Sequence, residues 1–171
     1  MRTFSFFLFL FFSFQFPLHA KQAIEIGTEV GRYAPTFELS DLEGRLITLE
    51  SLRGQVVLLN FWSTLCAPCV AEMPSLNRLS SALRNKGLVI SVAIDSNDKP
   101  VREYVRKNAI SFTVLLDKDK AVFFDEYAGP SLPVTYLLDR NGVIVDTFSG
   151  PQVWDAPEMK KRVMKLLEEN E

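Results

Sequence analysis

The chain has 171 residues, 47% of them hydrophobic, and a formal net charge of −2. This length suits one domain with a targeting segment, and the apolar fraction supports a packed core. The lack of a basic stretch argues against a nucleic-acid partner. The chain beyond residue 20 contains no histidine, which excludes Cys–His and Ser–His catalysis and histidine-based metal sites there.

The first 20 residues have the pattern of a secretory signal peptide. Arg2 precedes an apolar run at residues 4–16 that holds 8 of the 14 phenylalanines, and the small residue Ala20 ends a candidate cleavage site. The run is shorter than the roughly 20 residues that a membrane-spanning helix needs. An uncleaved anchor and a buried helix of the domain are the alternatives. We therefore predict an exported, periplasmic or otherwise extracytoplasmic protein, anchored in the membrane if this segment is retained.

Residues 21–31 lack a strong period and are predicted to be a linker, and residues 32–171 are predicted to be one domain. The elements predicted in chain order are strands at 36–39, 46–49 and 56–62, a helix at 67–85, a strand at 88–94, a helix at 100–107, a strand at 113–116, a helix at 118–127, strands at 134–138 and 143–148, and a helix at 156–169.

Three local signals organise this pattern. Residues 56–62 (VVLLNFW) have the length and the branched and aromatic content of a buried central strand. Pro74 falls inside the first helix, where its ring removes a hydrogen bond and should kink the helix. Asn141-Gly142 between two apolar runs is typical of a β-hairpin. The alternation predicts an α/β fold with a central mixed sheet, helices on both faces and an additional hairpin near the N-terminus.

Cys66 and Cys69 are the only two cysteines, and they stand where the strand 56–62 passes into the following helix. A disulfide between them closes too short a loop to be a useful structural crosslink. Zinc needs about four ligands, which the Cys and His residues here do not supply, so neither metal nor cofactor is predicted. A helix N-terminus stabilises a thiolate. We predict an exposed nucleophile at Cys66 and a more buried resolving thiol at Cys69; an inert pair is the alternative.

Three motifs in order resemble the TlpA/ResA-like branch of the thioredoxin superfamily, whose domains are of the AhpC/TSA or redoxin type. The first comprises APTFEL at 34–39, DLEG at 41–44 and LRGQ at 52–55; the second is NFWSTLCAPC at 60–69 followed by EMP at 72–74; the third is LPVTYLLDRNG at 132–142. The resemblance spans roughly residues 33–167. It implies a thioredoxin-like fold and protein thiol–disulfide oxidoreductase activity through a redox-active disulfide.

The resemblance also implies roles for residues outside the cysteine pair. Pro133 would be a cis-proline facing the pair, and Leu132 would present its backbone to a bound substrate chain. Without the family, Pro133 is a proline at a strand entry. Trp62 matches an aromatic residue beside the active site, where it would contact substrate, pack in the core, or both.

Glu72 is the candidate proton-handling residue. It lies one helical turn after Cys69, and the matching glutamate of the family would handle the proton of the buried thiol, which requires a desolvated carboxyl group with a raised pKa. A solvated helix glutamate is the alternative. Asn60 stands where ordinary thioredoxins have a buried aspartate, which favours Glu72 for this role. Leu65 departs from the family, because a tryptophan usually precedes the first cysteine; this affects the expected partner and not the exchange chemistry.

Two other functions compete with this prediction. A thiol peroxidase of the peroxiredoxin type would have the context Pro-x-x-x-Thr-x-x-Cys, but Leu59 and Ser63 stand in place of its proline and threonine. A chaperone-like module that binds chains without redox turnover would have no use for the cysteine pair.

The family's usual assignment is reduction of protein disulfides such as apocytochrome c cysteines, with a membrane thiol electron donor. The residues between the cysteines do not decide between this reductant and a disulfide-forming oxidant, and the reductant is favoured by resemblance alone. A monomer is the default for a single compact domain.

Overall fold

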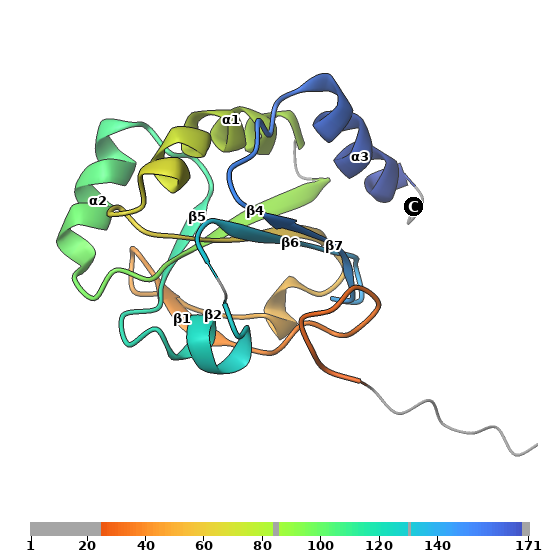
Figure 1. The fold of residues 1–171 in the computed structure, drawn as a ribbon, viewed down its shortest axis with the longest axis horizontal. Coiled ribbons are helices and arrows are strands. Elements are labelled where there is room, and N and C mark those ends of the chain that lie inside the picture. Colours follow the sequence, from red (N-terminus) through yellow and green to blue (C-terminus); the bar gives the residue numbers. More distant parts are fainter. Residues whose placement is uncertain (1–24, 84–85, 130, 169–171) are drawn as a thin grey trace, which may run out of the picture.

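A single mixed sheet organises the chain, as the computed structural model of residues 25–83, 86–129 and 131–168 shows (Figure 1). Its seven strands run in the order β2-β1-β5-β4-β3-β6-β7. They are β1 (Glu38–Asp41), β2 (Leu46–Thr48), β3 (Val56–Trp62), β4 (Gly87–Ala93), β5 (Thr113–Leu116), β6 (Val134–Leu138) and β7 (Ile144–Ser149). The pairs β3–β4 and β4–β5 are parallel and the other pairs are antiparallel, so the predicted mixed sheet and N-terminal hairpin are confirmed.

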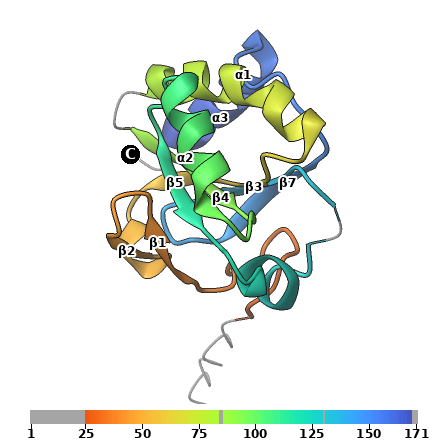
Figure 2. The ribbon, with the colours of Figure 1, turned by 90° about the vertical axis from the view of Figure 1, so that its left-hand side faces the viewer.

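The three α-helices of the described residues, α1 (Ala67–Leu83), α2 (Asp98–Lys107) and α3 (Pro157–Glu168), lie on one face of the sheet (Figures 1 and 2). On the opposite face, the helical segments of the described residues are the 3₁₀ turn η1 (Glu50–Leu52) and the π-helical turn η2 (Val122–Glu126), and the segment before β1 packs there as well. The sheet order explains this, because β3, β4 and β5 advance across the sheet in one direction. Two right-handed crossovers in the same direction place both connecting helices on the same face. Helical segments thus cover both faces, as predicted, but unequally.

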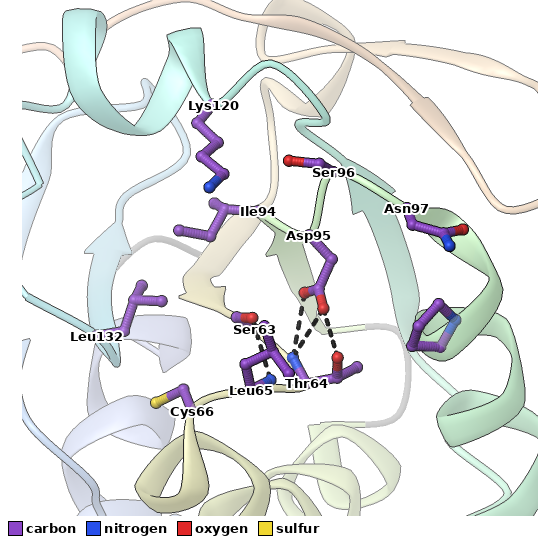
Figure 3. A pocket seen from close by; sticks show the side chains of 11 residues that line it. Ser63, Thr64, Leu65, Cys66, Ile94, Asp95, Ser96, Asn97, Lys120 and Leu132 are labelled. Carbon is purple, nitrogen blue, oxygen red and sulfur yellow. Dashed lines mark hydrogen bonds between the residues drawn. The ribbon is translucent and has the colours of Figure 1, made fainter.

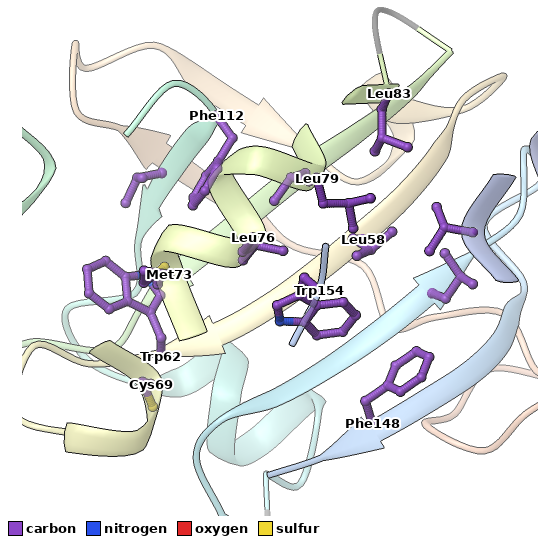
Figure 4. Close-up of a cluster of buried hydrophobic side chains, with 14 of the residues drawn as sticks. Leu58, Trp62, Cys69, Met73, Leu76, Leu79, Leu83, Phe112, Phe148 and Trp154 are labelled. Atoms are coloured by element: carbon purple, nitrogen blue, oxygen red, sulfur yellow. The ribbon is translucent and has the colours of Figure 1, made fainter. Parts of the chain in front are cut away.

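Strand β3 and helix α1 form the centre of the fold. All seven residues of β3 are buried, as its continuous apolar run predicts. The predicted apolar stripe of α1, Met73, Leu76, Leu79 and Leu83, is also buried and faces the sheet (Figure 4). This packing fixes α1, and therefore the cysteine pair at its beginning, against the end of β3.

The helix predicted at 118–127 forms only in part, as the π-helical turn η2 at Val122–Glu126. Lys120 has a left-handed backbone with φ of 66°, which interrupts a right-handed helix. The Asp117 carboxylate accepts hydrogen bonds from the amide N–H groups of Val122 and Phe123, at 3.3 and 2.8 Å. These bonds cap a helical turn that begins at Val122, later in the chain than predicted. Only the single turn η2 forms.

The N-terminal part of the described chain packs along the domain. Within the predicted linker, the Gly31 amide donates to the carbonyl of Ile144 at 2.8 Å, and Ile26 forms a bridge with Tyr33. The predicted signal segment, residues 1–20, lies outside the described residues. In the ranges that the structure covers, no helix combines the length and the apolar character needed to cross a membrane.

Candidate active site

The cysteine pair lies at the junction of β3 and α1, and the two sulfurs form a disulfide with Cα atoms 5.2 Å apart. Cys69, in the first turn of α1, is fully buried, whereas Cys66 is half-buried and faces a surface cavity. The backbone amide of Cys69 donates to Cys66 Sγ at 3.3 Å. This confirms the predicted difference in exposure. It also places a helix N-terminal amide where it would stabilise a thiolate on Cys66.

The loop before Cys66 is fixed to the end of β4. Asp95 lies two residues beyond that strand, and its carboxylate accepts the Thr64 amide at 3.1 Å and the Thr64 hydroxyl (Figure 3). The Ser63 carbonyl accepts the Cys66 amide at 3.1 Å. Sequence reasoning missed Asp95. Its position just beyond the carboxyl end of a parallel strand, where ligands and catalytic groups gather in α/β folds, was the available signal.

Glu72 is buried in α1, with only 3% of its surface exposed, so the solvated alternative is wrong. Three donors surround its carboxyl group. Asn60 Nδ2 donates to Oε1 at 2.9 Å, and the Gln152 amide and Trp154 Nε1 donate to Oε2 at 2.9 and 3.1 Å. Burial raises the pKa of Glu72, and these hydrogen bonds oppose the rise without cancelling it. This direction agrees with the raised pKa that a proton-handling role requires.

Asn60 connects the carboxyl group to the sheet. Its Nδ2 donates both to Glu72 and to Thr135 Oγ1, the latter at 2.9 Å. Its own Oδ1 is buried and has no hydrogen-bond partner in the described part of the chain. Because the oxygen and nitrogen of an amide can exchange places by rotation, Asn60 can either donate to an ionised Glu72 or accept from a protonated one.

Trp62 lies in the core, in the same cluster of buried side chains as Cys69. It is 1% exposed, and its ring packs against Tyr104 with centroids 5.3 Å apart. Its core-packing role is therefore confirmed. The predicted contact with substrate is not supported, because so small an exposed surface offers nothing to a bound chain.

Leu132 and Pro133 are joined by a cis peptide bond, as the family resemblance implies. Pro133 is buried at the start of β6, and the partly exposed Leu132 lines the same cavity as Cys66. The cavity has a volume of about 490 Å³ and also contacts Leu65, which is 93% exposed. Two segments that are far apart in sequence thus meet beside the more exposed sulfur.

The comparisons with known proteins agree with this geometry. The model of the AhpC/TSA family matches residues 30–147. The chain is 38% identical over 125 residues to "Thiol-disulfide oxidoreductase ResA" of Bacillus anthracis, covering 72% of each chain. It is 37% identical over 139 residues to "Thioredoxin-like protein YneN" of Bacillus subtilis, covering 80% of this chain and 81% of that one. This chain belongs to the AhpC/TSA family.

Within the AhpC/TSA family, the structural likeness points to the thiol–disulfide oxidoreductases. The crystal structure of a putative thiol:disulfide interchange protein DsbE from Chlorobium tepidum superposes with a TM-score of 0.75 at 27% identity, covering 82% of this chain and 99% of that one. The relatives and the cysteine pair together identify this AhpC/TSA protein as a thiol–disulfide oxidoreductase with a thioredoxin-like fold.

Proposed function

We propose that this enzyme reduces protein disulfides, with Cys66 as nucleophile and Cys69 as resolving thiol. The observation that carries the proposal is the difference in access between the two sulfurs. Cys66 borders an open cavity while Cys69 is fully buried, so a client can reach only the first. Buried Cys69 is then reserved for the intramolecular step.

The two steps conserve atoms and electrons. The Cys66 thiolate attacks one sulfur of the client disulfide, a mixed disulfide forms, and the other client sulfur leaves as a thiolate that takes up a proton. The Cys69 thiolate then attacks Cys66 Sγ, and the first client sulfur leaves. Two electrons have passed to the client, and the Cys66–Cys69 disulfide remains. A thiol donor must reduce it before the next turnover.

Glu72 is proposed to take the proton of the Cys69 thiol before the second step. Residues three apart on a helix are neighbours, and both side chains are buried. Burial raises the pKa of Glu72 toward the range where a carboxylate can accept a proton from a thiol and return it. The Asn60 amide would rotate when Glu72 gains or loses its proton, since it can donate to the ionised carboxylate or accept from the protonated carboxyl group.

In more detail, we propose that the protein is an exported monomer. It would reduce disulfides between client cysteines, such as those of apocytochrome c, and would itself be reduced by a membrane thiol donor. The N-terminal apolar run and the sequence resemblance support it. Leu132 and Pro133 are proposed to hold the client backbone, and their place on the cavity wall beside Cys66 supports this role. The alternative is the opposite redox direction, in which the enzyme is an oxidant that forms disulfides in its clients.

The reduction potential of the Cys66–Cys69 pair tests the direction. The purified chain is equilibrated with glutathione or dithiothreitol buffers, and the fraction oxidised is read after the thiols are trapped. A value near or below about −270 mV supports a reductant, whereas a value near about −120 mV indicates a disulfide donor and rejects reduction of cytochrome cysteines. The Cys66→Ser variant is the control and must show no transition.

A further inference from the structure

A lysine faces the cavity beside the nucleophile. We propose that Lys120 forms a subsite for an acidic side chain of the client, next to the disulfide that Cys66 attacks. Lys120 is thus a specificity-determining residue, and the inference rests on the proposed reduction of protein disulfides. Lys120 and Cys66 line the same cavity, and Figure 3 shows the ammonium end of Lys120 directed into it.

The backbone fixes the position of this lysine. Lys120 has φ of 66°, in the left-handed region that residues other than glycine seldom adopt. Its amide donates to the Asp117 carbonyl at 3.1 Å, and its carbonyl accepts the Phe124 amide at 2.9 Å. The residue is therefore held between the end of β5 and η2. A conformation of this kind persists only where its surroundings determine it, and here it places a cation at the cavity wall.

Only two of the residues lining the cavity are charged, Lys120 and Asp95. The Asp95 carboxylate already accepts the amide and the hydroxyl of Thr64. No carboxylate of the described residues forms an ion pair with Lys120, whereas the nearby Lys118 lies 3.5 Å from Asp98. The cavity thus offers a cation with no ion-pair partner among the described residues, and a carboxylate that is bonded to Thr64.

The remaining walls suit a side chain of the client. Ile94 and Leu132 are apolar and line the cavity together with the partly exposed Lys120. Apolar walls strengthen the attraction between an ammonium and a carboxylate. A client chain that passes Leu132 to reach Cys66 would place a residue close to its target cysteine in this space. Glutamate or aspartate at that position would pair with Lys120, while lysine there would meet a like charge.

Peptides of matched sequence test this subsite. Each carries one internal disulfide and a single glutamate, placed in turn at each of the three positions on either side of the attacked cysteine; a second set has glutamine instead. The measured quantity is the ratio of kcat/KM for the glutamate peptide to kcat/KM for the glutamine peptide, with dithiothreitol as electron source. We expect a ratio of about three at one position at low salt, which declines as salt screens the pair.

Variants then assign the preference to this lysine. Lys120→Gln should abolish the ratio, Lys120→Glu should reverse it, and Lys120→Arg should retain it. Lys118→Gln makes the same charge change two residues away and should leave the ratio and the rate unaltered. A ratio of one at every position, or equal loss in Lys118→Gln, would overturn the subsite. Failure to reduce even the glutamine peptides would instead reject the proposed function, so the two failures are distinct.

Discussion

Replacing Glu72 with glutamine removes the proposed proton acceptor while keeping the shape of the site. The amide oxygen of the new side chain can take the place of Oε2 and accept from the Gln152 amide and Trp154 Nε1. Its NH₂ group would then face Asn60, whose Oδ1 has no partner among the described residues and can accept after rotation of the amide. We therefore expect Glu72→Gln to fold and to keep the hydrogen-bond network.

The stability of the wild-type chain should depend on pH through this group. Because burial raises the folded-state pKa of Glu72 above its unfolded value, the native state binds the proton more tightly. The free energy of unfolding then falls as pH rises from the unfolded pKa through the folded one, by at most about 1.4 kcal/mol per pH unit for a single proton. Glu72→Gln should lose this decline. The variant therefore gains stability relative to wild type as pH increases.

Two assays measure these effects. Urea unfolding of the oxidised chain across pH 4–9 reports the stability, and release of a peptide from a preformed mixed disulfide on Cys66 reports the resolving step. Release should be about 10²-fold slower in Glu72→Gln at neutral pH, the lower end of what a positioned proton acceptor contributes. Glu103→Gln, an exposed glutamate of α2, is the matched control. Identical pH profiles for wild type and Glu72→Gln would refute the reasoning.

Three further substitutions give separate tests. Cys69→Ala should trap clients on Cys66 as mixed disulfides, visible as bands on non-reducing gels that dithiothreitol removes; absence of such bands contradicts the two-step mechanism. Trp154→Phe removes a donor that favours the ionised carboxylate, so the pKa of Glu72 should rise further and the pH dependence of release should move upward; an unmoved profile would count against this hydrogen bond. Leu76→Ala, at a fully buried position between α1 and the sheet, should lower the free energy of unfolding by about 2–5 kcal/mol in chemical denaturation, and a loss below about 1 kcal/mol would contradict the packing described.

Local signals in the sequence predicted the elements that carry the cysteines. The apolar run of β3 needs only its own composition to indicate a buried strand, and its predicted bounds at 56–62 are those observed. The predicted bounds of β5 and β6 are also those observed. The hairpin at Asn141-Gly142 forms as predicted, with its second strand one residue later than expected. The extent of the helix at 118–127 was mispredicted, because neither the left-handed backbone of Lys120 nor the capping by the Asp117 carboxylate changes the spacing of apolar residues in the sequence.

The sequence by itself determined the cysteine pair and its place at a strand-to-helix junction, and its resemblance to a known family implied the role of Glu72 one turn along the same helix. These depend on residues within a few positions of one another. The tertiary structure decided the environment of Glu72, because two of its donors come from residues 80 and 82 positions away. It also placed Lys120 and Cys66 on the walls of one cavity, and the three α-helices of the described residues on one face. Each of these follows from the order of strands in the sheet, which long-range pairing sets and no local pattern encodes.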